Sequence, residues 1–214
     1  KLTRSKEKFC LLGETGDYSI SIDRALIKVR RVTVSPSVML AHSVVLQDKN
    51  AKYPVKRVVV KPYTISPGSI TTTLASIHTG VVPKRVVVGF LDTIAFDGSY
   101  ASNPFNFQHF NINNLVLKVA SKAVPYSSGL KMNFKDGNYI DGYNSLFQGI
   151  AQKGNDITYS DYANGYTLFA FDLTPDGCSG DHFSLLRDGS LDLDLTFDKN
   201  PDKGITAIFY LEFD

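Results

Sequence analysis

Apolar residues recur at every second position in several segments of the chain, a pattern typical of strands with one dry face. The alternation is clearest near the C-terminus, in Gly165–Pro175, Ser190–Phe197 and Ile205–Phe213. Gly, Pro, Asp or Asn bounds each of these segments. Comparable patterns predict earlier strands over 9–12, 18–23, 25–34, 55–61, 84–91 and 110–119, and residues 70–77 suit either an edge strand or a loop.

Two segments carry helical patterns instead. A helix is predicted to begin at Ser35–Pro36, because a hydroxyl can cap a helix and Pro suits the first helical position. Its apolar stripe extends to about Gln47. A second helix is predicted within Tyr139–Gln152, although each glycine there weakens it by ~1 kcal/mol relative to Ala. It lies in a long excursion, Pro125–Asp161, and such excursions often contact partners.

Strands far outnumber helices, which predicts an all-β fold. An antiparallel, eight-stranded jelly-roll sandwich with one or two short helices in inter-strand excursions accommodates these elements. The 214 residues, of which 43% are hydrophobic, suffice for one such core. We expect residues 1–17 to form a basic arm and lead-in, and residues 18–214 to form a single jelly-roll domain.

The charge is unevenly distributed, although the net charge is only +2. Up to Pro125 there are 17 Lys and Arg against 7 Asp and Glu, whereas from Tyr126 onward there are 6 against 14. If the two parts occupy different faces, the molecule is a dipole suited to packing against its own copies. If they interleave in one sandwich, much of the charge cancels locally. No apolar run approaches the ~18 residues of a membrane span.

Residues suited to chemistry are scattered. No two of the four histidines stand at metal-ligand spacing, and the chain has no phosphate loop and no Gly-x-Ser-x-Gly elbow. We therefore expect no enzyme, no metal and no cofactor, although a triad assembled in space stays open. Cys10 and Cys178 are expected to be reduced rather than joined in a disulfide, and a disulfide stays open.

Two sets of charged residues allow a functional and a structural interpretation. Asp192 and Asp194 alternate with leucines, so both point to one strand face. They suit a calcium site or an acid/base pair, but a solvated edge is the favoured interpretation. Basic pairs at 30–31, 56–57 and 84–85 suit solvated strand ends or contacts with an acidic neighbour or nucleic acid. No strand displays stacking aromatics, so no specific nucleic-acid recognition is expected.

Several longer segments resemble a known protein family. The most specific is Asp161–Asp176, DYANGYTLFAFDLTPD. The others are Ala51–Val60, Pro83–Asp92, Phe96–Tyr100, Asn103–Phe110, Gly154–Thr158 and Tyr210–Asp214. Together they resemble the hexon-like major capsid proteins, of the double jelly-roll lineage, of Maverick/Polinton virus-like transposons and adintoviruses. The resemblance extends from about Ile22 to the end of the chain, and it implies the C-terminal jelly roll of a protein about twice as long.

The resemblance implies a structural capsid protein that forms homotrimeric capsomers and tiles an icosahedral shell. Its partners would be copies of itself and other capsid proteins, in the virion and, before assembly, inside the host cell. The resemblance implies no catalytic residue in this chain. The alternative is a jelly-roll binding module for carbohydrate or calcium, in a viral or a host-domesticated copy.

Contacts between copies are expected in the loop Asn103–Phe110 and the excursion Tyr139–Asp161, because exposed aromatic side chains often anchor interfaces. Local packing of these loops is the alternative explanation. The candidate self-association residues are Pro104, Phe105, Phe107, His109, Tyr139, Tyr143, Phe147 and Tyr159.

Overall fold

The computed structural model describes residues 3–13, 18–53, 55–150, 155–177 and 185–213. The chain divides into two units. The first comprises Lys1–Tyr18 together with Lys56–Asp214, and it holds every described strand. The second, Ser19–Val55, holds one helix.

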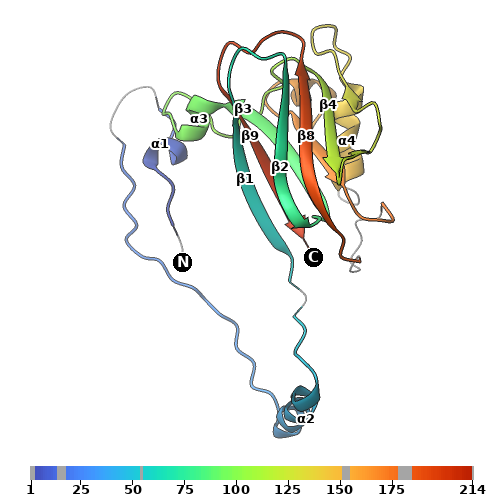
Figure 1. Ribbon diagram of the computed structural model, residues 1–214. Helices are drawn as coiled ribbons and strands as arrows, with labels where there is room; N and C mark the ends of the chain where they lie inside the picture. The colour runs from blue at the N-terminus through green and yellow to red at the C-terminus, as the bar shows by residue number, and fades with distance from the viewer. Residues whose placement is uncertain (1–2, 14–17, 54, 151–154, 178–184, 214) are drawn as a thin grey trace. The chain divides into compact units, whose positions relative to one another are not determined.

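The first unit is a β-sandwich of two antiparallel sheets (Figure 1). One sheet has the order β1-β9-β3-β7, and the other has the order β2-β8-β4-β5, with β6 also paired to β4. The strands are β1 (Arg57–Ile65), β2 (Thr71–Val81), β3 (Arg85–Asp92), β4 (Ile112–Val119), β5 (Lys122–Val124), β6 (Leu130–Lys131), β7 (Leu168–Asp172), β8 (Asp188–Phe197) and β9 (Ile205–Phe213). The all-β prediction is confirmed, but the described residues form nine strands rather than eight.

The alternation of the sequence is what builds the core. In β8, Leu191, Leu193, Leu195 and Phe197 are buried, while the residues between them are half-buried. Residues of β3 and β9 meet this row from the other sheet. Because full burial of a Leu or Phe side chain contributes about 1.5–3 kcal/mol, this pattern fixes which face of each strand points inward.

The ninth strand arises because β5 and β6 are two interrupted parts of one strand position. β4 and β5 are joined by Ala120 and Ser121, both at positive φ (47° and 66°), as in a two-residue hairpin turn. β5 ends before Pro125, which has no N–H for the ladder. β6 then resumes pairing with β4 at Leu130. Since β8 pairs with the other side of β4, β5 and β6 share one strand position.

Short helices lie in the connections between strands. The predicted helix within 139–152 is confirmed as α4 (Ile140–Ile150), which packs on the edge strand β7. Two single-turn helices, α3 (Thr93–Asp97) and α5 (Tyr159–Ala163), begin at the side-chain caps Asp92 and Thr158.

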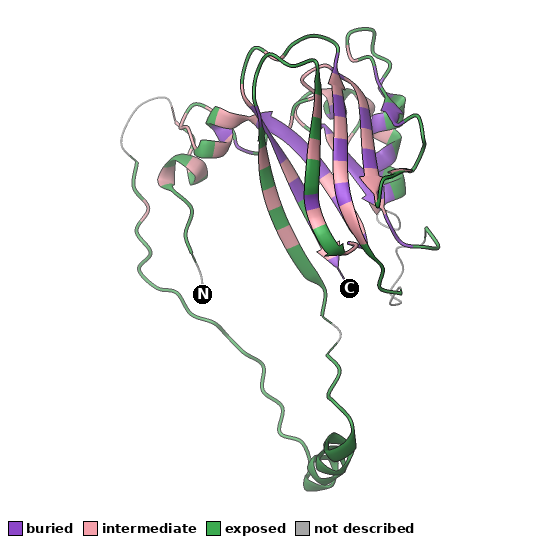
Figure 2. Cartoon of the chain, in the orientation of Figure 1, coloured by how far each residue is buried: buried purple, intermediate pink, exposed green. Residues whose placement is uncertain are grey.

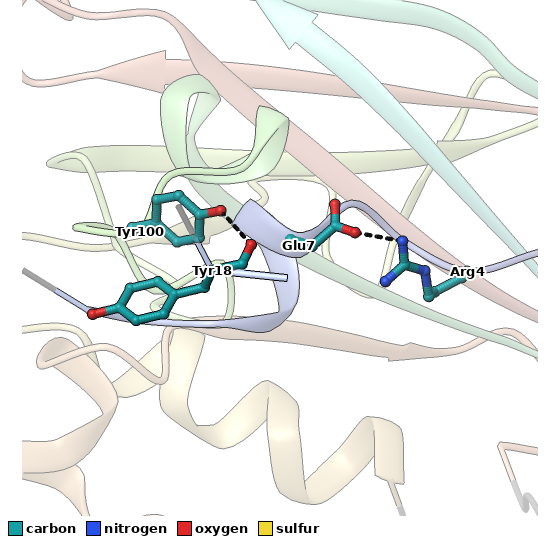
Figure 3. Close-up of polar contacts among 4 residues, drawn as sticks. All are labelled: Arg4, Glu7, Tyr18 and Tyr100. Carbon is teal, nitrogen blue, oxygen red and sulfur yellow. Dashed lines mark hydrogen bonds and ion pairs between the residues drawn. The ribbon is translucent and has the colours of Figure 1, made fainter. Parts of the chain in front are cut away.

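The N-terminal lead-in differs from the prediction. The strand expected over 9–12 is replaced by a helical turn, α1 (Glu7–Cys10), which contacts α3. Phe9 packs edge-on against Phe105, and Gly13 N–H donates to the carbonyl of Tyr100 (3.0 Å). Tyr100 Oη donates to the carbonyl of Tyr18 (3.1 Å), as Figure 3 shows beside the Arg4–Glu7 ion pair.

In the second unit, the strands predicted over 18–23 and 25–34 are not present. These residues have no strand partner among the described residues, and alternation alone cannot supply one. The predicted helix is confirmed as α2 (Pro36–Asp48), but none of its residues is buried. Figure 2 shows α2 and the segment before it as exposed. That residues 19–55 belong to one domain with the sandwich stays a prediction.

Candidate functional site

Four aromatic rings form a column at one end of the sandwich. His109 stacks on Phe134 with ring centroids 4.1 Å apart, and Phe134 stacks on Tyr139 at 4.9 Å. Tyr139 in turn stacks on Tyr159 at 4.2 Å. The angles between neighbouring planes are 7–11°. The column therefore joins four segments that are separate in the sequence.

A second group of rings surrounds the buried Tyr162. Its centroid lies 5.7 Å from Tyr143, 6.0 Å from Tyr139 and 6.3 Å from Phe169 on β7. α4 supplies Tyr143, α5 supplies Tyr162, and Tyr139 immediately precedes α4. Because edge-to-face ring pairs add about 0.5–1.5 kcal/mol beyond their area, this group attaches both helices to the sheet.

The tyrosine hydroxyls of the column and of the group around Tyr162 are engaged inside the protein. Tyr139 Oη donates to the carbonyl of Tyr159 (3.1 Å), and Tyr159 Oη donates to the carbonyl of Gly137 (2.8 Å). Tyr143 Oη donates to the carbonyl of Ile157 (2.9 Å). Burial raises the pKa of Tyr162 well above its ordinary value, and burial and then Tyr159 raise the pKa of Tyr139. At neutral pH both stay protonated, so they act as donors rather than bases.

His109 is held in its neutral form. Its Nδ1 accepts a hydrogen bond from the Asn111 N–H (2.9 Å), which requires that nitrogen to be unprotonated. Burial lowers the pKa of His109, which favours the same form. The geometry accounts for His109 through packing and a local hydrogen bond.

The structure separates the eight candidate residues into two classes. Pro104 and Tyr139 are buried, and Phe107, His109, Tyr143 and Tyr159 are half-buried. Phe105 and Phe147 are exposed, at 64% and 44%. The half-buried and buried rings make local packing contacts, and contact between copies through any of the eight residues stays a prediction.

Two residues that organise the site were not among the sequence candidates. Phe134 bridges His109 and Tyr139, and Tyr162 connects the helices to β7. Tyr162 lies within the distinctive segment DYANGYTLFAFDLTPD, which was the one available signal. Phe134 gave none, because its role depends on rings that are distant in the sequence.

Asp192 and Asp194 of β8 belong to a hydrogen-bonded surface. Asp192 accepts from the Ser76 N–H (2.7 Å), and Asp194 accepts from the Thr73 hydroxyl (2.9 Å) and pairs with Lys118. The hydrogen bond from Lys118 is the main cause that lowers the pKa of Asp194. Within the described ranges, no three His, Cys, Asp or Glu side chains gather as metal ligands would.

Arg57 and Arg85, the first residues of β1 and β3, have structural partners. The Arg57 guanidinium lies 4.5 Å from the centre of the Phe213 ring. Arg85 pairs with Glu212 (3.1 Å) and donates to the carbonyl of Gly149 (2.8 Å). Arg30 and Arg31 are exposed in the second unit. Cys10 is an exposed free thiol, whereas Cys178 and His182 lie outside the described residues.

A polar hollow of about 400 Å³ lies beside the loop that contains Phe105. Amide and charged side chains dominate its lining, which includes Asn103, Asn106, Gln108 and Lys203. Phe110 is the one aromatic residue among the residues that line it. A sugar ring usually requires an apolar platform beside its hydrogen-bonding groups, and this hollow offers little of one.

No family model matches this chain. The chain is similar to an uncharacterized protein, F54H12.2, of Caenorhabditis elegans, with 23% identity over 177 residues. The similar region covers 79% of this chain and 42% of the C. elegans protein, so the chain spans less than half the length of that relative. Among the described residues, no helix has the length and apolar character needed to cross a bilayer.

Proposed function

We propose that this chain is a jelly-roll domain of a capsid-type structural protein, and that its function is to associate with copies of itself. The order of the strands in the two sheets carries the proposal. Counting β5 and β6 as one position gives eight strand positions. In chain order, the sheets then become 1-8-3-6 and 2-7-4-5. A jelly roll alternates its eight strands between two sheets in this way.

The second support is the manner in which the loops are held. The aromatic column and the group around Tyr162 fix α4 and α5 to the sandwich, so these two helices present a rigid surface. A rigid surface loses little entropy when it binds, which favours association. Phe105 and Phe147 supply exposed rings on such surfaces.

The resemblance to Maverick/Polinton and adintovirus capsid proteins gives this association its proposed form. The whole protein would form homotrimeric capsomers that tile an icosahedral shell, with other capsid proteins as further partners. Its location would be the virion and, before assembly, the interior of the host cell. The domain has no catalytic role in this proposal.

The mass of the particles in solution tests the proposal. Analytical ultracentrifugation of the 214-residue chain, over a range of protein and salt concentrations, should detect trimers or larger assemblies. Negative-stain electron microscopy should then show regular capsomers. A strictly monomeric chain that binds glycans in an array or titration would refute the proposal and favour the carbohydrate-binding alternative.

A further inference from the structure

One edge of the first sheet is covered, and the opposite edge is not. α4 lies along the edge strand β7, where the Ala170 N–H donates to Ser145 Oγ (3.3 Å). β1 forms the other edge, and no described strand pairs with its free side. Unpaired edges bind other strands readily, and proteins normally protect them with charges, short strands or a covering element.

The outer face of β1 is apolar as well as uncovered. Val58 and Val60 are exposed at 44% and 58%, and they adjoin the exposed Tyr210 of β9. Figure 2 shows exposed positions along the length of β1. By contrast, β2, an edge of the second sheet, presents Thr71 and Thr73 and has an irregular register between Leu74 and His78. β1 is therefore the more apolar of these two edges, and Pro62 is its one position without an N–H for a further strand.

The chain also contains a strand-like segment that has no strand partner among the described residues. Residues 25–34 carry the strand pattern of the sequence, yet residues 21–53 are all exposed. Ten residues span ~33 Å in an extended strand, close to the ~30 Å of the nine residues of β1. Ile27, Val29 and Arg31 lie on one side of the segment, and Lys28 and Arg30 lie on the other with Leu26 and Val32. Pairing can bury Ile27 and Val29 and leave Lys28 and Arg30 in water, while Arg31 lies toward the end of the buried side.

The net charges of residues 19–55 and of the remainder of the chain have opposite signs. Residues 19–55 contain six Lys and Arg and two Asp, a net charge of +4. The remainder of the chain contains 17 Lys and Arg and 19 Asp and Glu, a net charge of −2. Opposite net charges favour the encounter of two copies, although β1 itself carries the cations Arg57 and Lys61.

We propose that residues 25–34 of one copy pair with the free edge of β1 in a second copy, so that the sheet β1-β9-β3-β7 gains a fifth strand from its neighbour. Addition of a strand to an exposed edge is a common mode of recognition, and exchange of an element between copies forms oligomers at low cost. This inference rests on the proposed function, because it specifies how copies associate.

Proline substitution in the segment tests the pairing in the full chain. Val29→Pro removes an N–H and should weaken association about tenfold or more, as measured by ultracentrifugation. Asn50→Pro is the matched control, because it places Pro at another exposed position of the same unit, and it should associate like the wild type. If the wild type associates and Val29→Pro associates equally well, this inference is overturned while the proposed function stands. A monomeric wild type overturns this inference, and a monomeric wild type that binds glycans overturns the proposed function as well.

A cross-linking experiment distinguishes two copies from one. In a background of Cys10→Ser and Cys178→Ser, one preparation carries Val29→Cys and another carries Val60→Cys. Mixing them with a flexible bis-maleimide should give a covalent dimer that contains one copy of each. If only a chain that carries both cysteines reacts, and it forms a cross-linked monomer, then the segment pairs within its own copy and the proposal is wrong.

Discussion

Gly149 is the position where a single methyl group should disturb the site most clearly. It faces β7 from the last turn of α4, and a Cβ built on it would lie 2.3 Å from the carbonyl carbon of Ala170 and 2.5 Å from its oxygen. Ordinary contacts begin at 3.4 Å, so Gly149→Ala requires α4 to move by about 1 Å. Rotation of a side chain cannot relieve the clash, because these atoms belong to the backbone.

Two opposing effects determine the size of the change. Ala favours a helix over Gly by about 1 kcal/mol, whereas overpacking of a buried site costs about 1–3 kcal/mol. Movement of the helix would also stretch the hydrogen bond from Arg85 to the carbonyl of Gly149 (2.8 Å) and the bond between Ser145 and Ala170 (3.3 Å). We therefore expect Gly149→Ala to lower the free energy of unfolding by about 1–2 kcal/mol.

Urea denaturation followed by circular dichroism measures this free energy. Asn144→Ala is the matched control, because residue 144 lies on the exposed side of the same helix. It should leave stability unchanged or raise it by up to about 0.7 kcal/mol. If Gly149→Ala is as stable as the wild type or more stable, then the close approach of α4 to β7 is wrong.

Gly142 and Gly149 also show what the sequence could not reveal about α4. As single residues they argue against a helix, because each lowers helix propensity. In the structure Gly142 and Gly149 are seven residues apart and face the interior, where Gly142 approaches Met132 and Tyr162. The absence of a side chain permits this packing. Local propensity and tertiary packing thus act in opposite directions here, and only the fold shows which prevails.

The strands also show where a local sequence pattern is not sufficient to predict the structure. β9 begins and ends where the sequence places it, because a row of buried apolar side chains needs only the local pattern and a core. Residues 25–34 carry a comparable pattern, but a strand also requires a partner for its backbone. A partner lies elsewhere in the chain or in another molecule, so the local pattern alone predicted a strand over 25–34 that the structure does not have.

The candidate site was predictable in composition but not in arrangement. Aromatic residues at 105, 139, 143 and 159 could be identified as a group with one purpose. Whether each ring is an exposed anchor or part of a stack depends on Phe134 and Tyr162, whose positions follow from the path of the excursion. Thus the sequence alone does not show which of these aromatic side chains remain exposed.

Two further changes test local features of the fold. The double change Ala120→Asn and Ser121→Gly places the preferred residue pair of a two-residue hairpin turn at two positions with positive φ. It should raise the free energy of unfolding by about 1 kcal/mol, as measured by urea denaturation. No increase would contradict the turn geometry. Burial lowers the pKa of His109 in the folded chain, so the unfolded chain binds more protons below the ordinary value of about 6.5. Stability is therefore complete above that pH and declines as the pH falls toward the lowered pKa, where protonation also removes the acceptor of the Asn111 N–H. His109→Asn keeps an acceptor but has no group that titrates, so its stability should decline less than that of the wild type between about pH 7 and pH 5. Equal declines in denaturation series at matched pH would show that His109 is not buried in its neutral form.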